Sequence, residues 1–148
     1  MNLFGVMELS GTALTAERIR AEVVAANMAN AETTRTQDGG PYRRQNVVFA
    51  ANQMEQSSFG GVLSSQLDPT KGSEGVEVAA VVASQGAPLR RYSPGHPDAD
   101  ADGYVSFPDI NPMTEMVDLM GANRSYQLNA TAVQAEKSML QASIDLLK

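Results

Sequence analysis

The most suggestive chemical pattern in this sequence is a run of alternating acidic residues in its second half. Asp98, Asp100 and Asp102 are separated by single alanines, and Gly103 follows directly. Carboxylates at positions 1, 3 and 5 with a glycine at position 6 are typical of a calcium-binding loop between two helices. Position 12 of such a loop is normally a bidentate glutamate, whereas this chain has Asp109.

The surroundings of the Asp98–Asp109 loop favour a solvated turn over a calcium site. Pro94 and Pro97 occupy the stretch where a helix would have to lead into the loop, and proline disrupts a helix interior. The segment after the loop, 104–107, has an extended pattern instead of a helical one. Aspartates in turns hydrogen-bond to their own backbone. A calcium-binding helical and β module is kept as the alternative hypothesis.

The other reactive residues form no recognisable catalytic or metal-binding set. His96 is the only histidine, the chain has no cysteine, and the glycines match no phosphate-binding loop. A hydrolase that used His96 with a carboxylate would have no further support in the sequence. Met113, Met116, Met120 and Met139 could line an adaptable binding groove or pack along a helix. We therefore expect no enzyme activity, no catalytic residue, no metal and no cofactor.

Composition limits the class of protein further. The 148 residues are 43% hydrophobic but only 5% aromatic, without tryptophan, which suits a helical bundle better than a compact enzyme core. The net charge of −6 argues against a nucleic acid partner. No apolar run is long enough to predict a membrane span. The amino-terminal residues lack the charge and apolar pattern of a Sec signal, so work outside the cytoplasm would require another export route.

The elements that would position these residues are dominated by one long helix from about Asn111 to Lys148. Asn111 is a favourable N-cap and Pro112 suits the first helical position. Two stripes with steps of three and four residues run along this segment, as in a helix packed along a partner. The first stripe is Met116, Leu119, Asn123, Tyr126, Ala130, Val133, Lys137, Leu140, Ile144 and Leu147. The second stripe is Val117, Gly121, Ser125, Leu128, Ala132, Ala135, Met139, Ala142 and Leu146.

Two stripes on one helix have two interpretations. One stripe would face a partner within the chain, and the other would face neighbouring subunits of an assembly. The alternative is a globular bundle in which a central helix is covered on two sides. The second stripe is mostly small residues, which lose little free energy in water and allow close approach of another helix.

The intramolecular partner is predicted to be an amino-terminal helix over about residues 3–29. Its apolar spacing matches that of the closing helix, and we expect the two to pair in antiparallel orientation. Between them, strands are predicted at 42–49, 75–84, 89–92 and 104–107. The fold class is therefore mainly α with a small β-rich insertion, its terminal helices paired as an antiparallel coiled coil. The predicted domains are 1–32 plus 110–148 for the helical pair, and 33–109 for the loop and β-rich insertion.

Several segments carry a resemblance to a known family. Ala26–Thr34 resembles the amino-terminal signature of the bacterial flagellar axial proteins. Within that family the proximal rod proteins are the most similar. This second resemblance lies in Thr34–Thr36 with Gly39–Gln45, in His96–Val105, in Glu115–Met120 and in Arg124–Gln127. The resemblance extends over nearly the whole chain, and 57–75 is its least constrained part.

The resemblance implies a structural subunit of the proximal rod in the flagellar basal body. Such subunits assemble helically through their terminal helices, transmit torque and enclose the export channel. The implied partners are other rod proteins, basal ring and adaptor subunits, further copies of the chain, and the flagellar type III export apparatus. The implied location is the periplasmic part of the basal body, reached without a Sec signal. The expected assembly interface is Leu9, Ile19, Val23, Asn27, Asn30, Met116, Leu119, Tyr126, Val133, Leu140, Ile144 and Leu147.

Overall fold

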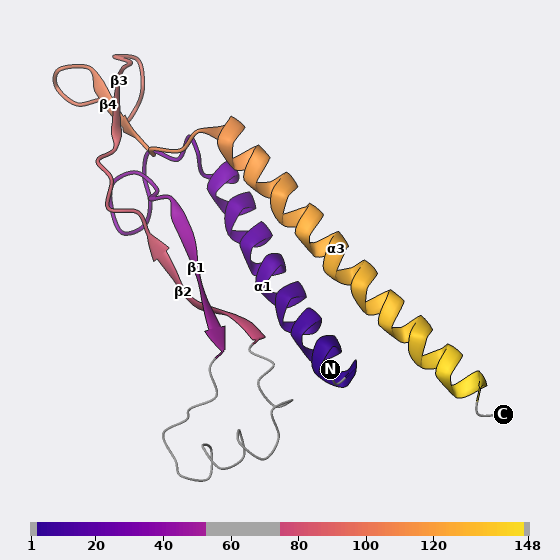
Figure 1. Ribbon diagram of the computed structural model, residues 1–148. Helices are drawn as coiled ribbons and strands as arrows, with labels where there is room; N and C mark the ends of the chain where they lie inside the picture. The colour runs from indigo at the N-terminus through magenta and orange to yellow at the C-terminus, as the bar shows by residue number, and fades with distance from the viewer. Residues whose placement is uncertain (1–2, 53–74, 147–148) are drawn as a thin grey trace, which may run out of the picture. The chain divides into compact units, whose positions relative to one another are not determined.

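The computed structural model describes residues 3–52 and 75–146, which form two long helices and, between them along the chain, two small sheets (Figure 1). The helices are α1 (Leu3–Ala29) and α3 (Pro112–Asp145). The strands are β1 (Gln45–Asn52), β2 (Gly75–Ala83), β3 (Leu89–Tyr92) and β4 (Tyr104–Phe107). β1 pairs with β2, and β3 pairs with β4. The predicted fold class, mainly helical with a small β-rich insertion, is confirmed.

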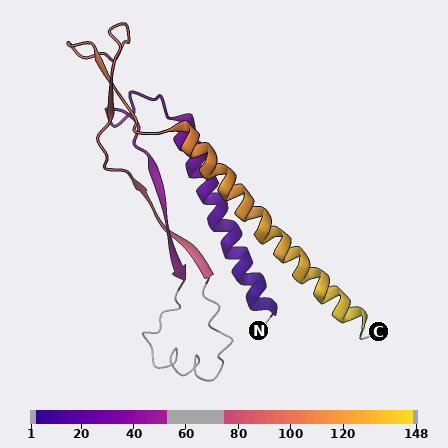
Figure 2. The ribbon, with the colours of Figure 1, turned by 45° about the horizontal axis from the view of Figure 1, so that its top comes forward.

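The terminal helices contact each other and run in opposite directions (Figure 2). Asn27, near the end of α1, hydrogen-bonds to Glu115 in the first turn of α3. Further back along α1, the Arg20 guanidinium lies 4.0 Å from the carboxylate of Asp118. Because the end of one helix meets the start of the other, the antiparallel pairing predicted from the sequence is confirmed.

The chain divides into two compact units, and each unit draws on both terminal helices. Unit 1 is Met1–Ile19, Phe49–Ala79 and Ala122–Lys148, and unit 2 is Arg20–Val48 and Ala80–Gly121. In unit 1, Thr12 on α1 accepts a hydrogen bond from the backbone N–H of Val76 at 3.2 Å. Gly75 permits this approach, since a Cβ there would lie 3.0 Å from the Thr12 hydroxyl. The predicted division into 1–32 plus 110–148 and 33–109 stays a prediction.

The start of α3 follows the capping signals in the sequence. The Asn111 side-chain oxygen accepts a hydrogen bond from the backbone N–H of Met113 at 3.0 Å, and Pro112 is the first helical residue. This satisfies one of the backbone donors that a helix start leaves without a partner, so the predicted N-cap is confirmed. The predicted end of the helix at Leu147 and Lys148 lies outside the described residues.

The buried side of α3 is offset from the predicted first stripe. Leu119, Val133 and Leu140 are half-buried as expected, but Asn123 and Lys137 are exposed. Every second position of the predicted stripe is shifted by one residue in the structure. The covered residues are those just before Met116, Asn123, Ala130 and Lys137, namely Glu115, Ala122, Asn129 and Glu136. Asn129 is half-buried and the other three are buried. The offset has a physical reason: three of these four residues are polar, so a pattern of apolar residues does not register them.

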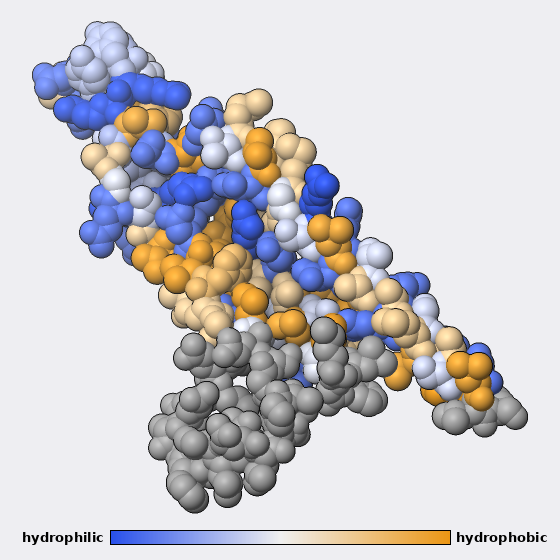
Figure 3. All heavy atoms as spheres, in the orientation of Figure 1, coloured by the Kyte–Doolittle hydropathy of each residue, from blue (hydrophilic) through white to orange (hydrophobic). Residues whose placement is uncertain are grey.

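The second stripe faces outward. Its large members Val117, Leu128, Met139 and Leu146 are all more than half exposed. Figure 3 shows apolar residues along the visible face of α3. Side chains of this kind are normally covered in a helix that packs on two sides within its own chain. The observed exposure favours the interpretation that this stripe faces neighbouring subunits.

The strands agree with the predicted segments except at the first one. The antiparallel β3–β4 pair has the register Leu89 to Phe107 through Tyr92 to Tyr104. The first strand, however, runs from Gln45 to Asn52 and not from Tyr42 to Phe49. The strand starts later than predicted because the Tyr42 backbone N–H donates to the carbonyl of Thr33, at 3.0 Å, and not to a neighbouring strand. The side chains of Tyr42 and Arg44 make polar contacts with the helices.

The turn before β4 depends on Gly103, and this dependence can be tested. Gly103 has a φ of +79°, and an added Cβ would lie 2.8 Å from the Tyr92 ring. We expect Gly103→Ala to lower the free energy of unfolding by about 2 kcal/mol, because alanine is strained in this conformation. Urea denaturation of the purified chain measures the change. Gly95→Ala in the same loop is the matched control, since open space surrounds Gly95. Equal stabilities of the two variants would contradict the expected strain.

Candidate functional site

A buried polar network in unit 2 joins the end of α1, the start of β1 and the first turn of α3. Its centre is Asn27 with Glu115, each only 1% exposed. The Asn27 side-chain nitrogen donates to Glu115 Oε2 at 3.2 Å and to the Gln45 carbonyl at 2.9 Å. Its oxygen accepts from the Gln45 backbone N–H at 2.8 Å and from the Tyr42 hydroxyl at 3.2 Å. Both donors and both acceptor positions of the amide are therefore used.

Arg44 supplies the positive charge of this network. Its Nε donates to Glu115 Oε1 at 2.6 Å, and a terminal nitrogen lies 3.5 Å from Asp118 Oδ2. The other terminal nitrogen donates to the side-chain oxygen of Asn46. Arg20 approaches the opposite oxygen of Asp118, at 4.0 Å. Two carboxylates thus face two guanidinium groups, and the most deeply buried carboxylate has the shortest contact.

The pKa of the Tyr42 phenol is shifted by its position in the network. Burial raises the pKa of its phenol above the ordinary value of 10.0, and the nearby negative charge of Glu115 raises it further. Both causes disfavour the phenolate, because it would be poorly solvated and would repel the carboxylate. The neutral phenol also suits its contact, since only the protonated form can donate a hydrogen bond to Asn27.

The acidic loop after β3 has its carboxylates turned toward cations and hydroxyls of the same unit. Asp98 accepts a hydrogen bond from the Thr34 hydroxyl at 2.8 Å and lies 3.8 Å from the Arg35 guanidinium. Asp100 pairs with Arg90 at 3.1 Å. In the part of the chain that the structure describes, no three histidine, aspartate or glutamate side chains are grouped so that they could hold a metal ion. The geometry gives the calcium hypothesis no support and agrees with a turn.

His96 is held within this same loop. Its Nδ1 accepts a hydrogen bond from the Asp98 backbone N–H at 3.1 Å, and its ring meets the Phe107 ring edge-on at 6.0 Å between centroids. These contacts fix a turn between the two strands. They account for His96 without a catalytic role.

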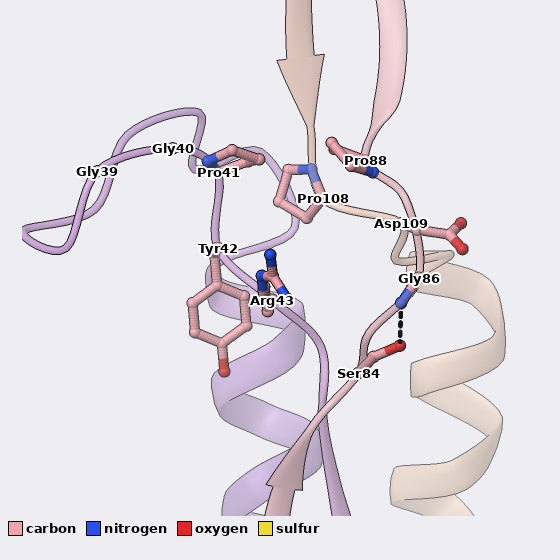
Figure 4. Close-up of a pocket in the computed structure, with 10 residues that line it drawn as sticks. All are labelled: Gly39, Gly40, Pro41, Tyr42, Arg43, Ser84, Gly86, Pro88, Pro108 and Asp109. Atoms are coloured by element: carbon pink, nitrogen blue, oxygen red, sulfur yellow. Dashed lines mark hydrogen bonds between the residues drawn. The ribbon is translucent and has the colours of Figure 1, made fainter.

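A small pocket in unit 2 is lined by residues from three segments, 39–43, 84–88 and 108–109 (Figure 4). Its volume is about 130 Å³, and its lining includes Pro41, Pro88 and Pro108. Figure 4 shows the three prolines close together, while the Tyr42 ring points away from them. Sites for small molecules usually measure about 300–1,000 Å³ and hold several converging polar groups. The pocket is too small for such a site.

The structure divides the residues of the expected assembly interface into three groups. Asn27 is buried in the polar network. The half-buried group is Leu9, Ile19, Val23, Asn30, Leu119, Val133 and Leu140. The exposed group is Met116, Tyr126 and Ile144. Leu147 lies outside the described residues. The assignment of these residues to an interface between subunits stays a prediction.

The polar network itself is missing from the sequence-based prediction. In the sequence, Arg44, Glu115 and Asp118 stand in segments that resemble the axial proteins, and the two acidic residues also suit the amino end of a helix. One signal was available: Asn27 occupies the buried side of a helix, where a polar residue needs specific partners. The partners lie 15 to 88 positions away along the chain, so the spacing of residues could not identify them.

Two family models match the two ends of this chain. Residues 7–36 match the model described as flagella basal body rod protein. Residues 101–146 match the model described as flagellar basal body rod FlgEFG protein C-terminal. The two terminal segments of this chain are therefore similar to the class of flagellar rod proteins.

Full-length relatives narrow the class to one family. The flagellar basal-body rod protein FlgC of Borreliella burgdorferi is 38% identical over 152 residues, which cover 100% of this chain and 99% of that protein. FlgC of Bacillus subtilis is 38% identical over all of both chains. FlgC of Escherichia coli is 38% identical over 99% of this chain and 98% of that protein. The chain belongs to the FlgC family of flagellar basal-body rod proteins, a family of structural subunits and not of enzymes.

The comparisons confirm the resemblance seen in the sequence and give the chain its place in the flagellar rod. A rod protein assembles with other rod proteins. Within the described residues, the helices lack the combination of length and apolar character that crossing a membrane requires.

The buried Glu115 makes the network sensitive to the loss of its cation. We expect Arg44→Met to lower the free energy of unfolding by about 3 kcal/mol, because it leaves a buried carboxylate without its charged partner. The neighbouring Arg43 is exposed, so Arg43→Met is the control, with an expected change within about 0.5 kcal/mol. Urea denaturation of both variants gives the comparison. An Arg44→Met variant as stable as Arg43→Met would show that the pair contributes little.

The raised pKa of Tyr42 predicts a loss of stability in alkali. Above pH 10.0 the unfolded chain releases the phenol proton before the folded chain does, so stability is full below this pH and falls as the pH rises. Tyr42→Phe should reduce the decline in unfolding free energy between about pH 9 and about pH 11. Tyr92→Phe, at an exposed position outside the network, is the control. If the two variants decline equally, the pH dependence does not come from Tyr42.

Proposed function

We propose that this chain assembles helically in the wall of the proximal rod through its terminal helices, where it transmits torque and encloses the export channel. The observation that carries the proposal is the exposed second stripe of α3. We call its exposed members the outer stripe: Val117, Gly121, Leu128, Ala132, Ala135, Met139, Ala142 and Leu146. Membership of the FlgC family supports the rod as the place of assembly.

The composition of the outer stripe suits contact with another helix. Its four large apolar side chains are more than half exposed, and full burial of each is worth roughly 1.5–3 kcal/mol. The residues between them are glycine and alanine, and small contact residues let helix axes approach to the short end of the usual 8–10 Å range. A terminal helix of a neighbouring rod subunit is the partner that fits this surface.

The remaining partners and the location follow from the same proposal. A subunit at the base of the rod would contact further copies of the chain, other rod proteins, and the basal ring and adaptor subunits. It would reach the periplasmic part of the basal body through the flagellar type III export apparatus.

Torque transmission places a demand on each subunit that the polar network can meet. A twisting load would shear α1 against α3. Directional hydrogen bonds and charge pairs oppose such a shift, because each has one preferred geometry. Asn27, Arg44 and Glu115 would hold the helices in register while the outer stripe bears the contact with the neighbour.

The outer stripe can be tested with one charged substitution. We expect Leu128→Asp to abolish incorporation into the rod and therefore swimming, because assembly would bury an unpaired carboxylate. The purified variant should keep the helicity and the unfolding free energy of the parent, since Leu128 is exposed in the single chain. Mass spectrometry of purified hook–basal bodies measures incorporation, and a motility assay in soft agar measures swimming.

Gln134→Asp is the matched control, because it adds the same charge at an exposed polar position of α3 outside the outer stripe. It should allow incorporation and swimming. Normal incorporation of Leu128→Asp would refute the assignment of the outer stripe to subunit contacts.

A further inference from the structure

Exposed methionines lie on α3 among the methionines that the structure describes, and Met139 in the outer stripe is 53% exposed. Met113, Met116 and Met120, at the start of α3, are 70%, 45% and 58% exposed. Their spacing of three and four residues places them on one side of the first turns of α3. We call these three residues the methionine face. Met7 and Met28 on α1, by contrast, are only partly exposed.

The methionine face adjoins the outer stripe. Met113 and Met120 lie four residues before and three residues after Val117, which is also exposed. Glu115 in the same turn is buried in the polar network. The two sides of this turn therefore differ: one holds the helix pair together, and the other presents thioethers to solvent.

Thioethers are the softest nucleophiles that this chain offers, because it contains no cysteine. Electrophilic peroxides react with exposed methionine when no thiolate competes. We propose that the methionine face is an oxidation site for hydrogen peroxide, and that its oxidation prevents the free subunit from entering the rod. The second half of this inference rests on the proposed assembly through α3.

The chemical step is balanced by the peroxide itself. The thioether sulfur donates an electron pair to one peroxide oxygen, an S–O bond forms and the O–O bond breaks. The proton of the attacked oxygen passes to the departing hydroxide, which leaves as water, so the sulfur is oxidised to the sulfoxide and the peroxide is reduced. Methionine sulfoxide reductases reverse this step, so the modification is not a terminal lesion.

The structural consequence follows from where the sulfoxide oxygen would lie. Each sulfoxide adds a polar oxygen to a surface that loses its water on assembly, and an unpaired buried polar group opposes that burial. The polar network lies on the other side of the turn, so the free subunit should stay folded. Once the subunit is assembled, its neighbour covers the methionine face and peroxide no longer reaches it.

The first experiment compares the rate of oxidation in two states of the full chain. Purified subunit and purified hook–basal bodies are exposed to the same peroxide concentration, and tryptic peptides are followed by mass spectrometry. Residues 92–124 carry the methionine face on one peptide, and residues 21–35 carry Met28 as an internal reference. In the free subunit we expect the methionine face to oxidise at least about fivefold faster than Met28. In hook–basal bodies this excess should disappear.

The second experiment tests the consequence with two matched triple variants. Replacing Met113, Met116 and Met120 together by leucine keeps an apolar surface of similar volume that peroxide cannot oxidise. Replacing all three by glutamine imitates the polar sulfoxide. We expect the leucine variant to assemble normally and the glutamine variant to be incorporated about tenfold less than the parent. Because Met139 in the outer stripe is 53% exposed and could also oxidise, the peroxide comparison is made with Met139→Leu in both chains. After peroxide treatment during flagellar growth, new rods should form with the chain that carries the leucine triple replacement but not with the chain that keeps the methionine face.

The outcomes separate this inference from the proposed function. Oxidation of the methionine face no faster than Met28 in the free subunit would overturn the oxidation site and leave assembly through α3 intact. Fast oxidation in both states would show that the face stays uncovered in the rod, which contradicts its place in a subunit contact. Equal sensitivity of the parent and the leucine variant to peroxide would overturn the control of assembly by oxidation.

Discussion

The contact on which the rest of this structure depends is the buried pair of Glu115 and Arg44, completed by Asn27. A carboxylate that is 1% exposed is tolerated only with a charged partner and further hydrogen bonds. Arg44 and Asn27 meet both requirements, and they come from different elements. The pair can therefore form only when α1, the start of β1 and α3 are all in place, which makes it a check on the whole arrangement of unit 2.

This network accounts for the burial of Glu115 on α3. The helix also buries Glu136, which lies outside the network, yet exposes Val117, Leu128 and Met139. A self-contained globular protein would normally place these residue types the other way round. In the proposed assembly the requirement differs: neighbouring subunits would cover the apolar stripe, and polar contacts such as that of Arg44 with Glu115 would hold the two helices in register.

The sequence predicts those parts of the fold that depend on local signals. The limits of α1, the Asn111 cap and the segments of β2, β3 and β4 follow from spacing, capping and turn chemistry, and the structure confirms them. The buried side of α3 could not be predicted in this way. Glu115, Asn129 and Glu136 lie on that side but are polar, and a pattern of apolar residues does not include them. The start of β1 was misplaced because Tyr42 and Arg44 serve contacts with the helices. Such contacts join residues that are far apart in the sequence, so they can be identified only in the folded structure.

In the acidic loop, too, tertiary contacts decide the role of residues whose local spacing suggests something else. Its spacing imitates a calcium loop, but Asp98 contacts Thr34 and Asp100 contacts Arg90. The Asp98 contact ties the loop to the segment after α1, and the Asp100 contact ties it to β3, so these carboxylates already have partners within the chain. Unit 2 holds these contacts and the buried network, whereas unit 1 carries the larger part of the outer stripe. The polar chemistry that specifies the fold and the apolar surface suited to assembly are thus concentrated in different parts of one continuous pair of helices.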